Sequence, residues 1–439
     1  MKFLGIARSD NGMLAAIGMP CTVCGYFCQE VLARLPDLDE SALFPSFRQT
    51  GDGKFLYSMS QLLLMSSSQR FLALDVLRGM TICFMIIVNT PGNGDTTYPP
   101  LLHASWNGFT PTDLVFPTFM FVVGNAMSFA MKKWEALSNA TVFWKIGKRT
   151  LIIFLLGFLM YWFPFVHWNS QHHLEFNPIS HTRIMGVLQR IALGYFFAAL
   201  MIRYIKPVAV YRLSVIFLVL YWLILLVCGD HADPYNMLTN AGSKLDLWLF
   251  GSNHLYHGEG VAFEPEGVLS TLPAIVNVVF GYAAGRWVQE KGRTYEGLAK
   301  LLLAGALSVI LALSWDWFFP INKKLWTGSF VLITVGIDCI ILAALIFIID
   351  FLQRRKWTYF FEVFGKNPLF IYLLSELGAT MLWFIHVGPN HQAVHRWLFQ
   401  NIFRHAGMYF GSFLFAISFM LFCWLIGYVL DERKVYVRV

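Results

Sequence analysis

Apolar residues in this chain gather in stretches about as long as a lipid bilayer is thick, and polar residues fall between them. A hydrocarbon core about 30 Å thick needs roughly 20 mainly apolar residues per helix. Windows of that size predict ten membrane-spanning helices, at 71–90, 111–131, 149–165, 184–202, 213–229, 268–286, 301–318, 328–350, 358–385 and 409–430. We therefore expect an all-α polytopic membrane protein.

Composition supports this prediction and excludes the main alternatives. Of the 439 residues, 57% are hydrophobic and 13% are charged. In soluble domains, about 45–50% of the residues are usually apolar and about 25% are charged. The net charge of +7 could indicate a nucleic-acid partner. So few charges in so apolar a chain indicate a protein of the lipid bilayer instead, and we expect no nucleic acid.

Basic residues orient the predicted helices, because cytoplasmic loops of membrane proteins carry an excess of Lys and Arg. If the first helix starts in the cytoplasm, the predicted inner segments hold 18 Lys and Arg. The outer segments hold six, which are Arg183, Lys244, Lys323, Lys324, Arg396 and Arg404. This imbalance predicts that both termini are cytoplasmic, and all twelve His residues then fall on the outer side.

The first 64 residues differ from the rest, with a mixed composition and no clean span. We divide the chain into a doubtful N-terminal extension, 1–64, and a transmembrane domain, 65–439. Met65 stands directly before the first predicted helix, which favours an over-extended start over a real cytoplasmic extension.

Cysteine and glycosylation patterns add little. A C-x2-C-x3-C cluster, Cys21, Cys24 and Cys28, has no partner cluster and is a weak metal signal. We expect no metal. The N-x-[ST] site at Asn139 falls on the predicted inner side, which favours a bacterial inner (plasma) membrane over a glycosylated lumenal protein.

Polar residues inside predicted spans are functional candidates, since an ionisable group costs at least about 2.5–3.5 kcal/mol to insert. Gln189 and Arg190 lie one to two turns into the fourth helix, and an Arg at that depth needs an anionic partner from protein or ligand. Asn367 and Glu376 add polar points on a later helix. Together these residues predict a helix bundle with a polar interior, as in a transporter or a membrane-embedded enzyme.

The segment after the first helix is the most informative. An imidazole side chain can accept and return a proton at neutral pH, which makes His103 a candidate base. Asp113 could cap the second helix or fix the tautomer of His103, and the two interpretations stay open. Trp106 offers a flat face for a sugar ring, or it belongs to the aromatic belt at the membrane surface.

Ordered motifs along the chain resemble heparan-α-glucosaminide N-acetyltransferase and its bacterial relatives. They include His103-Ala-Ser-Trp-Asn-Gly and Asp113-Leu-Val-Phe-Pro, and the resemblance covers about residues 70–439. The further matches are at 70–79, 88–89, 183–190, 246–256, 264–267, 320–326 and 365–368. The sequence departs from the animal enzyme in lacking a lumenal domain and an extra first helix, and in its loop at 90–102.

The resemblance implies that an acetyl group moves from cytoplasmic acetyl-CoA to a glucosamine amine on the far side. It implies a catalytic role for His103, with Asn89 beside it, and Asp113 completes the catalytic set that we expect. For the donor we expect Arg183, Gln189, Arg190 and Asn367. For the acceptor we expect Trp106, Asn107, Asp246, Glu266 and Glu376.

Other functions stay open. Some bacterial relatives are described as N-acetylglucosamine permeases, and an O-acyltransferase of envelope polysaccharide is a third possibility. A transporter should show paired broken helices or repeats at the bilayer midplane, and the sequence shows neither clearly. A homodimer also stays open, as does the choice between an acetyl-histidine intermediate and direct transfer.

Overall fold

The computed structural model describes residues 71–169, 171, 173–388 and 391–437, together with four two-residue strands nearer the N-terminus. Contacts divide the chain into two units, Met1–Arg70 and Phe71–Val439. The strands of the first unit form two antiparallel pairs, β1 (Ala7–Arg8) with β2 (Leu14–Ala15) and β3 (Arg48–Gln49) with β4 (Phe55–Leu56). The expected boundary at residue 64 and the cysteine cluster lie outside the described residues, so both stay predictions.

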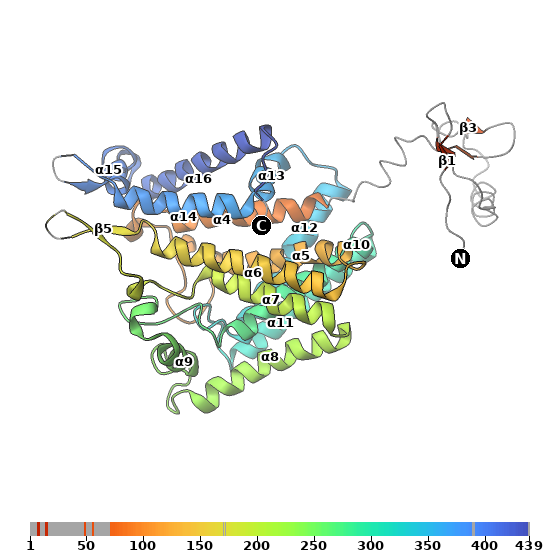
Figure 1. Cartoon of the computed structure of the whole chain (residues 1–439), viewed down its shortest axis with the longest axis horizontal. Helices are drawn as coiled ribbons and strands as arrows, with labels where there is room; N and C mark the ends of the chain where they lie inside the picture. The colour runs from red at the N-terminus through yellow and green to blue at the C-terminus, as the bar shows by residue number, and fades with distance from the viewer. Residues whose placement is uncertain are drawn as a thin grey trace. The chain divides into compact units, whose positions relative to one another are not determined.

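The described part of the second unit is built from thirteen α-helices (Figure 1). They are α4 (Leu72–Asn89), α5 (Val115–Lys133), α6 (Asn139–Trp162), α7 (Val187–Tyr204), α8 (Pro207–Cys228), α9 (Ala241–Phe250), α10 (Thr271–Lys291), α11 (Tyr295–Asp316), α12 (Gly328–Ile346), α13 (Thr358–Lys366), α14 (Pro368–Phe384), α15 (Val394–Asn401) and α16 (Met408–Glu432).

Short elements join these helices. The 3₁₀ turns are η1 (Gly94–Thr96), η2 (Pro99–Leu101), η3 (Pro111–Leu114), η4 (Ile179–His181), η5 (Ser252–His254) and η7 (Phe403–Ala406), and η6 (Phe347–Phe351) is a π turn. Two antiparallel hairpins pair β5 (Val166–Trp168) with β6 (Leu174–Phe176) and β7 (His386–Val387) with β8 (Gln392–Ala393).

Each of the ten predicted spans contains a helix, and the prediction of an all-α polytopic membrane protein is confirmed at that level. Within the described residues, seven helical segments are long and apolar enough to cross a membrane. They comprise α4, η3 with α5, α7, α8, α11, α12 with η6, and α16. Helices α6 and α10 and the pair α13–α14 occupy the other three predicted spans without meeting both conditions, so the count of ten stays a prediction.

The ninth predicted span, 358–385, is interrupted in the structure. Helix α13 ends at Lys366, and α14 begins at Pro368. A proline disfavours helical geometry in the residue before it, and Asn367 accordingly lies outside both helices, at φ −126° and ψ 51°. The hydropathy window missed this break because it joins the apolar residues on both sides of 365–368, which are Gly, Lys, Asn and Pro.

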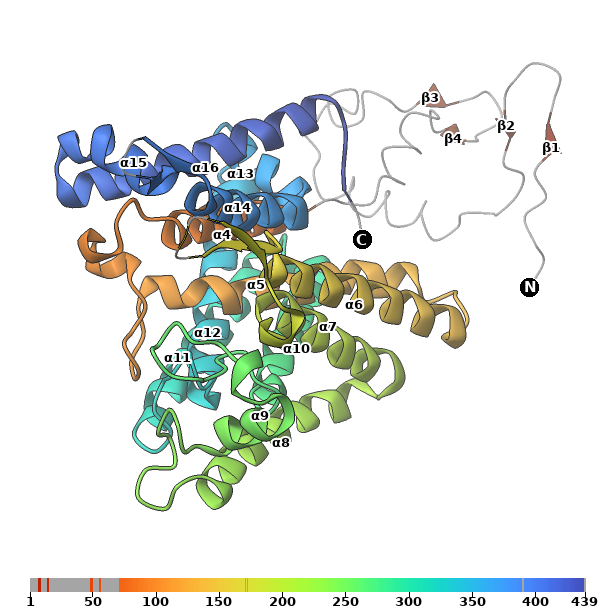
Figure 2. The same ribbon diagram turned by 60° about the vertical axis from the view of Figure 1, so that its left-hand side comes forward.

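The helices of the second unit lie side by side in both ribbon views (Figures 1 and 2). Their burial divides seven of them into an inner and an outer set. In α4, η3–α5, α7 and α12–η6, 56–67% of the apolar window is buried, against 28–33% in α8, α11 and α16. The outer set exposes large apolar side chains such as Ile216, Leu307 and Phe422. Such a surface suits lipid, because lipid tails are as apolar as these side chains.

Glycine allows the central helices to approach closely. Helix α5 packs along α10, and a Cβ atom added to Gly124 would overlap the carbonyl oxygen of Val278. A Cβ atom on Gly281 would likewise overlap the carbonyl oxygen of Phe121. Small residues at such contacts let two membrane helices pack backbone to backbone.

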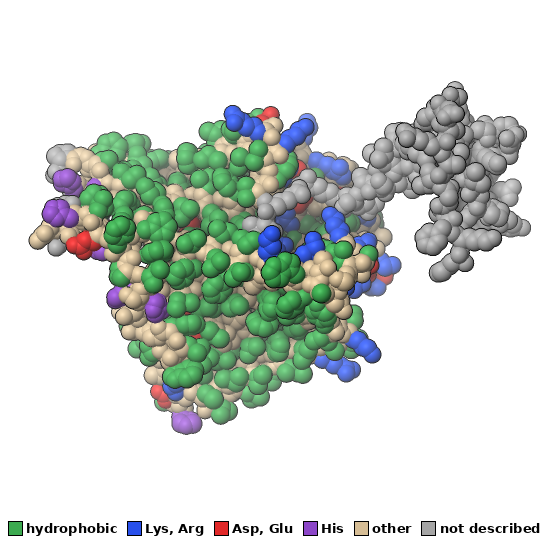
Figure 3. Space-filling model, viewed as in Figure 1, with side chains coloured by type: hydrophobic (Ala, Val, Ile, Leu, Met, Phe, Trp, Pro, Cys, Tyr) green, Lys and Arg blue, Asp and Glu red, His purple; other side chains and the backbone are tan. Residues whose placement is uncertain are grey.

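Charged side chains separate toward the two ends of the helices. On the face shown in Figure 3, Lys and Arg gather at one end and His at the other. The loop that follows α4, with His103, lies at the same end as β5 and α15 (Figure 1). This separation agrees with the predicted topology, and which end faces the cytoplasm stays a prediction.

Candidate active site

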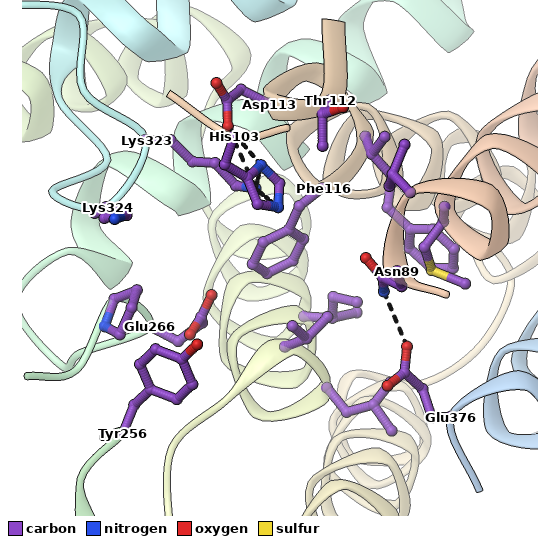
Figure 4. A pocket seen from close by; sticks show the side chains of 18 of the residues that line it. Asn89, His103, Thr112, Asp113, Phe116, Tyr256, Glu266, Lys323, Lys324 and Glu376 are labelled. Carbon is purple, nitrogen blue, oxygen red and sulfur yellow. Dashed lines mark hydrogen bonds and ion pairs between the residues drawn. The ribbon is translucent and has the colours of Figure 1, made fainter. Parts of the chain in front are cut away.

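A cavity of about 250 Å³ opens where α4, α5, α7 and α14 meet the loops at the His-rich end. Six of the twelve residues expected in the site line it: Asn89, His103, Asp113, Arg183, Glu266 and Glu376. They come from segments nearly 290 positions apart in the sequence, and Figure 4 shows all of them except Arg183 around one space. The fold therefore assembles half of the expected set in one place.

Asp113 is fixed by the start of the second span. Pro111 opens η3, and Thr110 and Asp113 form a capping box. Oδ2 of Asp113 accepts hydrogen bonds from the backbone N–H of Thr110 at 3.0 Å, from its hydroxyl at 3.0 Å, and from the N–H of Ala104 at 3.1 Å. A carboxylate in this position satisfies N–H groups that have no partner inside the helix.

The other oxygen of Asp113 holds His103. Oδ1 lies 2.7 Å from Nδ1 of His103, and the Asp113 side chain is 1% exposed whereas that of His103 is 45% exposed. Because an ionised carboxylate can only accept, Nδ1 must donate, and Nε2 of neutral His103 keeps its lone pair. The two interpretations of Asp113, helix cap and orienting partner, are therefore both met by its geometry, one oxygen for each.

Lys323, from the loop between α11 and α12, completes this cluster. Its Nζ lies 3.0 Å from Nδ1 and 3.2 Å from Nε2 of His103, and 3.6 Å from Oδ1 of Asp113. Near-equal distances to both ring nitrogens put the ammonium over the imidazole rather than along the lone pair of Nε2. Burial lowers the pKa of Lys323, although the carboxylates of Asp113 and Glu266 oppose the shift.

Asn89 and Glu376 form another side of the cavity (Figure 4). Nδ2 of Asn89, the last residue of α4, donates to Oε1 of Glu376 on α14 at 3.0 Å. An amide NH₂ has two N–H donors. The bond to Glu376 uses one of them and orients the group, and the second N–H is available to a bound carbonyl.

Arg183 anchors a cluster of carboxylates and rings at the cavity wall. Its guanidinium binds Glu264 through Nε at 3.0 Å and Nη2 at 2.5 Å, and it also bonds Glu266. The same group lies 4.8 Å from the ring centre of Tyr161 and 4.7 Å from that of Tyr256. Arg183 is thus already neutralised by protein carboxylates, which weakens its case as a phosphate ligand.

The carboxylates of this cluster differ in their environment. Burial raises the pKa of Glu264 to about 7, although Arg183 opposes the shift. Burial also acts on Glu266, but the charges of Arg183, Arg190 and Lys323 outweigh it and hold the pKa of Glu266 below its ordinary value. Glu266, which lines the cavity, is therefore ionised at neutral pH, and it shares its negative charge with the guanidinium of Arg183.

Two of the expected donor ligands on α7 are buried outside the cavity. Gln189 is fully buried. Arg190 is fully buried too, and it bonds the carbonyl of Gly267 at 3.2 Å and the hydroxyl of Ser270. Its guanidinium lies 4.8 Å from the ring centre of Trp326. The sequence led us to expect an anionic partner for Arg190. Within the described residues no carboxylate forms an ion pair with it, and its contacts are this carbonyl, this hydroxyl and this ring.

The remaining expected residues also lie outside the lining of the cavity. Asn367, at the break between α13 and α14, donates to the carbonyl of Val435 at 3.0 Å and accepts from the N–H of Val437 at 2.8 Å. Asp246 is buried and accepts from the N–H of Val268 at 2.9 Å.

Two expected acceptor ligands are in the loop beside His103. Trp106 packs edge-on against Phe263, with ring centres 5.7 Å apart. Asn107 is exposed and accepts from Nδ2 of Asn322 at 3.1 Å. Their roles as sugar ligands stay predictions, because neither lines the cavity itself.

The sequence interpretation omitted several residues that line the cavity, among them Lys323, Lys324 and Tyr256. Lys324 pairs with Glu259 at 2.7 Å and donates to the carbonyl of Ser105 at 2.8 Å. A signal for the two lysines was available, since they are adjacent basic residues on a predicted outer side that holds only six.

These features define a polytopic membrane protein with a polar cavity at one end of its helices, centred on a carboxylate-oriented histidine. Comparison with known proteins points to one family. The chain is 27% identical to human heparan-alpha-glucosaminide N-acetyltransferase over 427 residues, and 28% identical to the mouse enzyme of that name over 431. These alignments cover 84% and 85% of the chain and show distant homology to that family. No protein-family model matches the chain.

The alignments cover only part of each relative. The chain spans 60% of the length of the human protein and 61% of the mouse protein.

Proposed function

We propose that this protein is a membrane-embedded acetyltransferase that moves an acetyl group from cytoplasmic acetyl-CoA to the amine of a glucosamine-type sugar on the outer side. The observation that carries the proposal is the contact of 2.7 Å between Asp113 and Nδ1 of His103 in a cavity, which makes Nδ1 the donor and leaves the lone pair on Nε2, 3.2 Å from Nζ of Lys323. Homology to named N-acetyltransferases supports the same chemistry. We place the protein in the inner (plasma) membrane.

His103 acts as the base in this proposal. The amine nitrogen forms a bond to the acetyl carbon as the carbon–sulfur bond breaks. Nε2 takes the proton that the nitrogen loses and returns it to the departing sulfur. Asp113 stabilises the imidazolium that forms between these two transfers. A positioned histidine contributes typically about 10²–10⁴-fold to such a reaction.

Charge develops on the acetyl oxygen as the amine adds. The second N–H of Asn89 and the ammonium of Lys323 are the donors that line the cavity for this oxygen. Removing one such donor typically costs about 10²–10³ in kcat. Glu266, ionised at neutral pH, serves to attract a protonated amino sugar, and this ammonium gives up one proton to solvent before the neutral amine attacks.

The described cavity offers the CoA phosphates little positive charge, since its basic residues Arg183, Lys323 and Lys324 each lie close to a carboxylate. We therefore assign the acetyl end of the donor to the cavity. The phosphates would lie toward the basic, inner ends of the helices.

An assay on purified protein in proteoliposomes tests the proposal. Acetyl-CoA and a glucosamine disaccharide should give the N-acetylated sugar and free CoA in equal amounts. Uptake of N-acetylglucosamine without any consumption of acetyl-CoA would contradict the proposal and support a permease. Labelled acetyl-CoA without acceptor separates the routes, because a label retained by the wild type and lost in His103→Ala indicates an acetyl-histidine.

A further inference from the structure

Lys323 places a primary amine of the protein itself beside His103 in the candidate active site (Figure 4). Its Nζ lies 3.2 Å from Nε2 of His103, and its side chain is only 19% exposed. The proposed reaction uses Lys323 as a charge for the acetyl oxygen. A primary amine is also the group that this reaction acetylates, so Lys323 is a chemical acceptor as well.

The loop that carries Lys323 is fixed by its neighbour Asn322. This side chain is fully buried, and its Oδ1 accepts from the N–H of Leu325 at 2.8 Å. Nδ2 of Asn322 donates to Oδ1 of Asn107 at 3.1 Å, in the loop that holds His103. The two loops are therefore tied together, and the amine is held beside the imidazole.

The amine lies on the side of the ring from which an acetyl group can be attacked. Nζ is over the imidazole of His103, 3.0 Å from Nδ1 and 3.2 Å from Nε2. An acetyl group on Nε2 would lie in the plane of the ring, since resonance makes such a carbon–nitrogen bond planar. A nucleophile reaches the carbonyl carbon from above that plane. Amines held at about 3–3.5 Å gain effective molarities of up to about 10⁵–10⁸ M.

The neighbouring lysine differs in both position and partners. Burial lowers the pKa of Lys323, although the carboxylates of Asp113 and Glu266 oppose the shift, and a lower pKa favours the neutral amine, which is the nucleophile. Lys324 lines the same cavity, but its Nζ binds Glu259 at 2.7 Å and the carbonyl of Ser105 at 2.8 Å. Lys323 is therefore the lysine of this pair that is poised to react.

We propose that Lys323 is a self-acetylation site, which takes the acetyl group when acetyl-CoA is bound and no amino sugar is present. Its ammonium first gives one proton to solvent. Nζ then bonds to the acetyl carbon as the carbon–sulfur bond of the thioester breaks, and Nε2 of His103 carries the second proton from nitrogen to sulfur. From an acetyl-histidine, the bond between the acetyl carbon and Nε2 breaks instead, and Nε2 takes that proton. This proposal rests on the proposed function for the donor and the base, and it does not depend on the sugar.

Self-acetylation would stop the transfer to sugar. The product is a neutral amide, so the cavity loses the ammonium that serves the acetyl oxygen and that lies 3.6 Å from Asp113. The added acetyl group also fills part of a cavity of about 250 Å³. A bound amino sugar competes for the same acetyl group, and it should protect Lys323.

Mass spectrometry of the full-length protein tests the proposal. Wild-type protein in proteoliposomes is incubated with labelled acetyl-CoA without sugar, and fragment ions distinguish Lys323 from Lys324. Acetylation of Lys323 should exceed that of Lys324 by at least about tenfold, because only Lys323 is held beside the base. The label should resist hydroxylamine, which removes an acetyl group from histidine. A glucosamine disaccharide in the incubation should suppress the label.

Three variants connect the label to activity. His103→Ala should lower the rate of acetylation at Lys323 by about 10²–10⁴-fold. Lys323→Arg keeps a positive charge but cannot be acetylated, so whatever transfer activity it has at the start should survive incubation with acetyl-CoA. Lys324→Arg is the matched control, and it should lose activity during the incubation as the wild type does.

Several results would overturn self-acetylation. They are equal labelling of the two lysines, an unchanged rate of labelling in His103→Ala, or a loss of activity that persists in Lys323→Arg. Acetylated sugar together with unmodified Lys323 in the incubation without sugar would keep the acetyltransferase and reject this proposal. Acetyl-Lys323 that depends on His103, without any acetylated sugar, would keep this proposal and reject the proposed acceptor.

Discussion

The two oxygens of Asp113 serve different partners, and one substitution separates them. In Asp113→Asn, the amide oxygen can keep the bonds to Thr110 and Ala104, but the amide nitrogen then donates to Nδ1 of His103. His103 would carry its proton on Nε2 and could no longer act as a base. We expect kcat to fall by about 10²–10⁴ with little change in KM or in the thermal midpoint.

Asp113→Ala is the companion variant, because it removes both functions. The lost cap should lower the stability by about 1 kcal/mol in addition to the loss of kcat. If Asp113→Asn kept the kcat of the wild type, Asp113 would be a helix cap only.

Asp246 gives a test of stability against pH. Burial raises its pKa to about 6 from 3.8, although Val268 and Arg190 oppose the shift. Folding therefore favours the protonated carboxyl, so the group stabilises the fold fully below pH 3.8, and this stabilisation is lost as pH rises through 6.

Asp246→Asn keeps an acceptor for Val268 but cannot ionise. The substitution should remove a penalty of up to about 3 kcal/mol at pH 8. We expect a higher thermal midpoint than the wild type at pH 8 and a nearly equal one at pH 4, measured in detergent. A lower midpoint for the variant at pH 8 would show that ionised Asp246 stabilises the fold.

Among the elements, the contact between α5 and α10 depends on the absence of a side chain. Gly281→Leu should push the two helices apart, because its Cβ atom already overlaps the backbone of Phe121. Overpacking of this kind costs typically about 1–3 kcal/mol, and we expect a lower thermal midpoint and less folded protein.

Gly147→Leu is the matched control, since the space beside Gly147 on α6 is open. It should unfold at nearly the temperature of the wild type. A drop of equal size in both variants would attribute the effect to leucine in a helix rather than to the contact.

Hydropathy alone located the helices well, because each long apolar run must be covered by lipid or protein. It did not predict α9, α15 or the two hairpins, which are short and depend on packing against the loops. It also missed the break at Asn367, where Gly, Lys, Asn and Pro at 365–368 interrupt the apolar residues and the proline disfavours helical geometry in the residue before it.

The site was predictable only in part, for a physical reason. His103 and Asp113 lie ten residues apart around one helix start, so local pattern and resemblance both indicate them. Lys323 and Tyr256 reach the cavity through loops far away in the chain, and no local pattern shows which loops meet. Arg190 resembled a ligand because a buried charge is costly, but Trp326, Ser270 and a carbonyl contact it instead.

At the scale of the whole molecule, Lys and Arg gather at one end of the described helices, and the cavity with His103 lies at the His-rich end. The basic ends would lie in the cytoplasm, where acetyl-CoA is available, and the histidine cavity would face the other side. The proposed reaction must therefore carry an acetyl group across the membrane, which no soluble acetyltransferase does.

The most direct measurement uses proteoliposomes in which the basic ends of the helices face the interior of the vesicle. Acetyl-CoA is placed inside and a glucosamine disaccharide outside. The wild type should release N-acetylated sugar outside while CoA stays inside. His103→Ala should lower this rate by about 10²–10⁴-fold. The control His386→Ala changes an outer histidine that does not line the cavity, and it should keep the rate of the wild type. An unchanged rate in His103→Ala, or no external product from the wild type, would contradict the account.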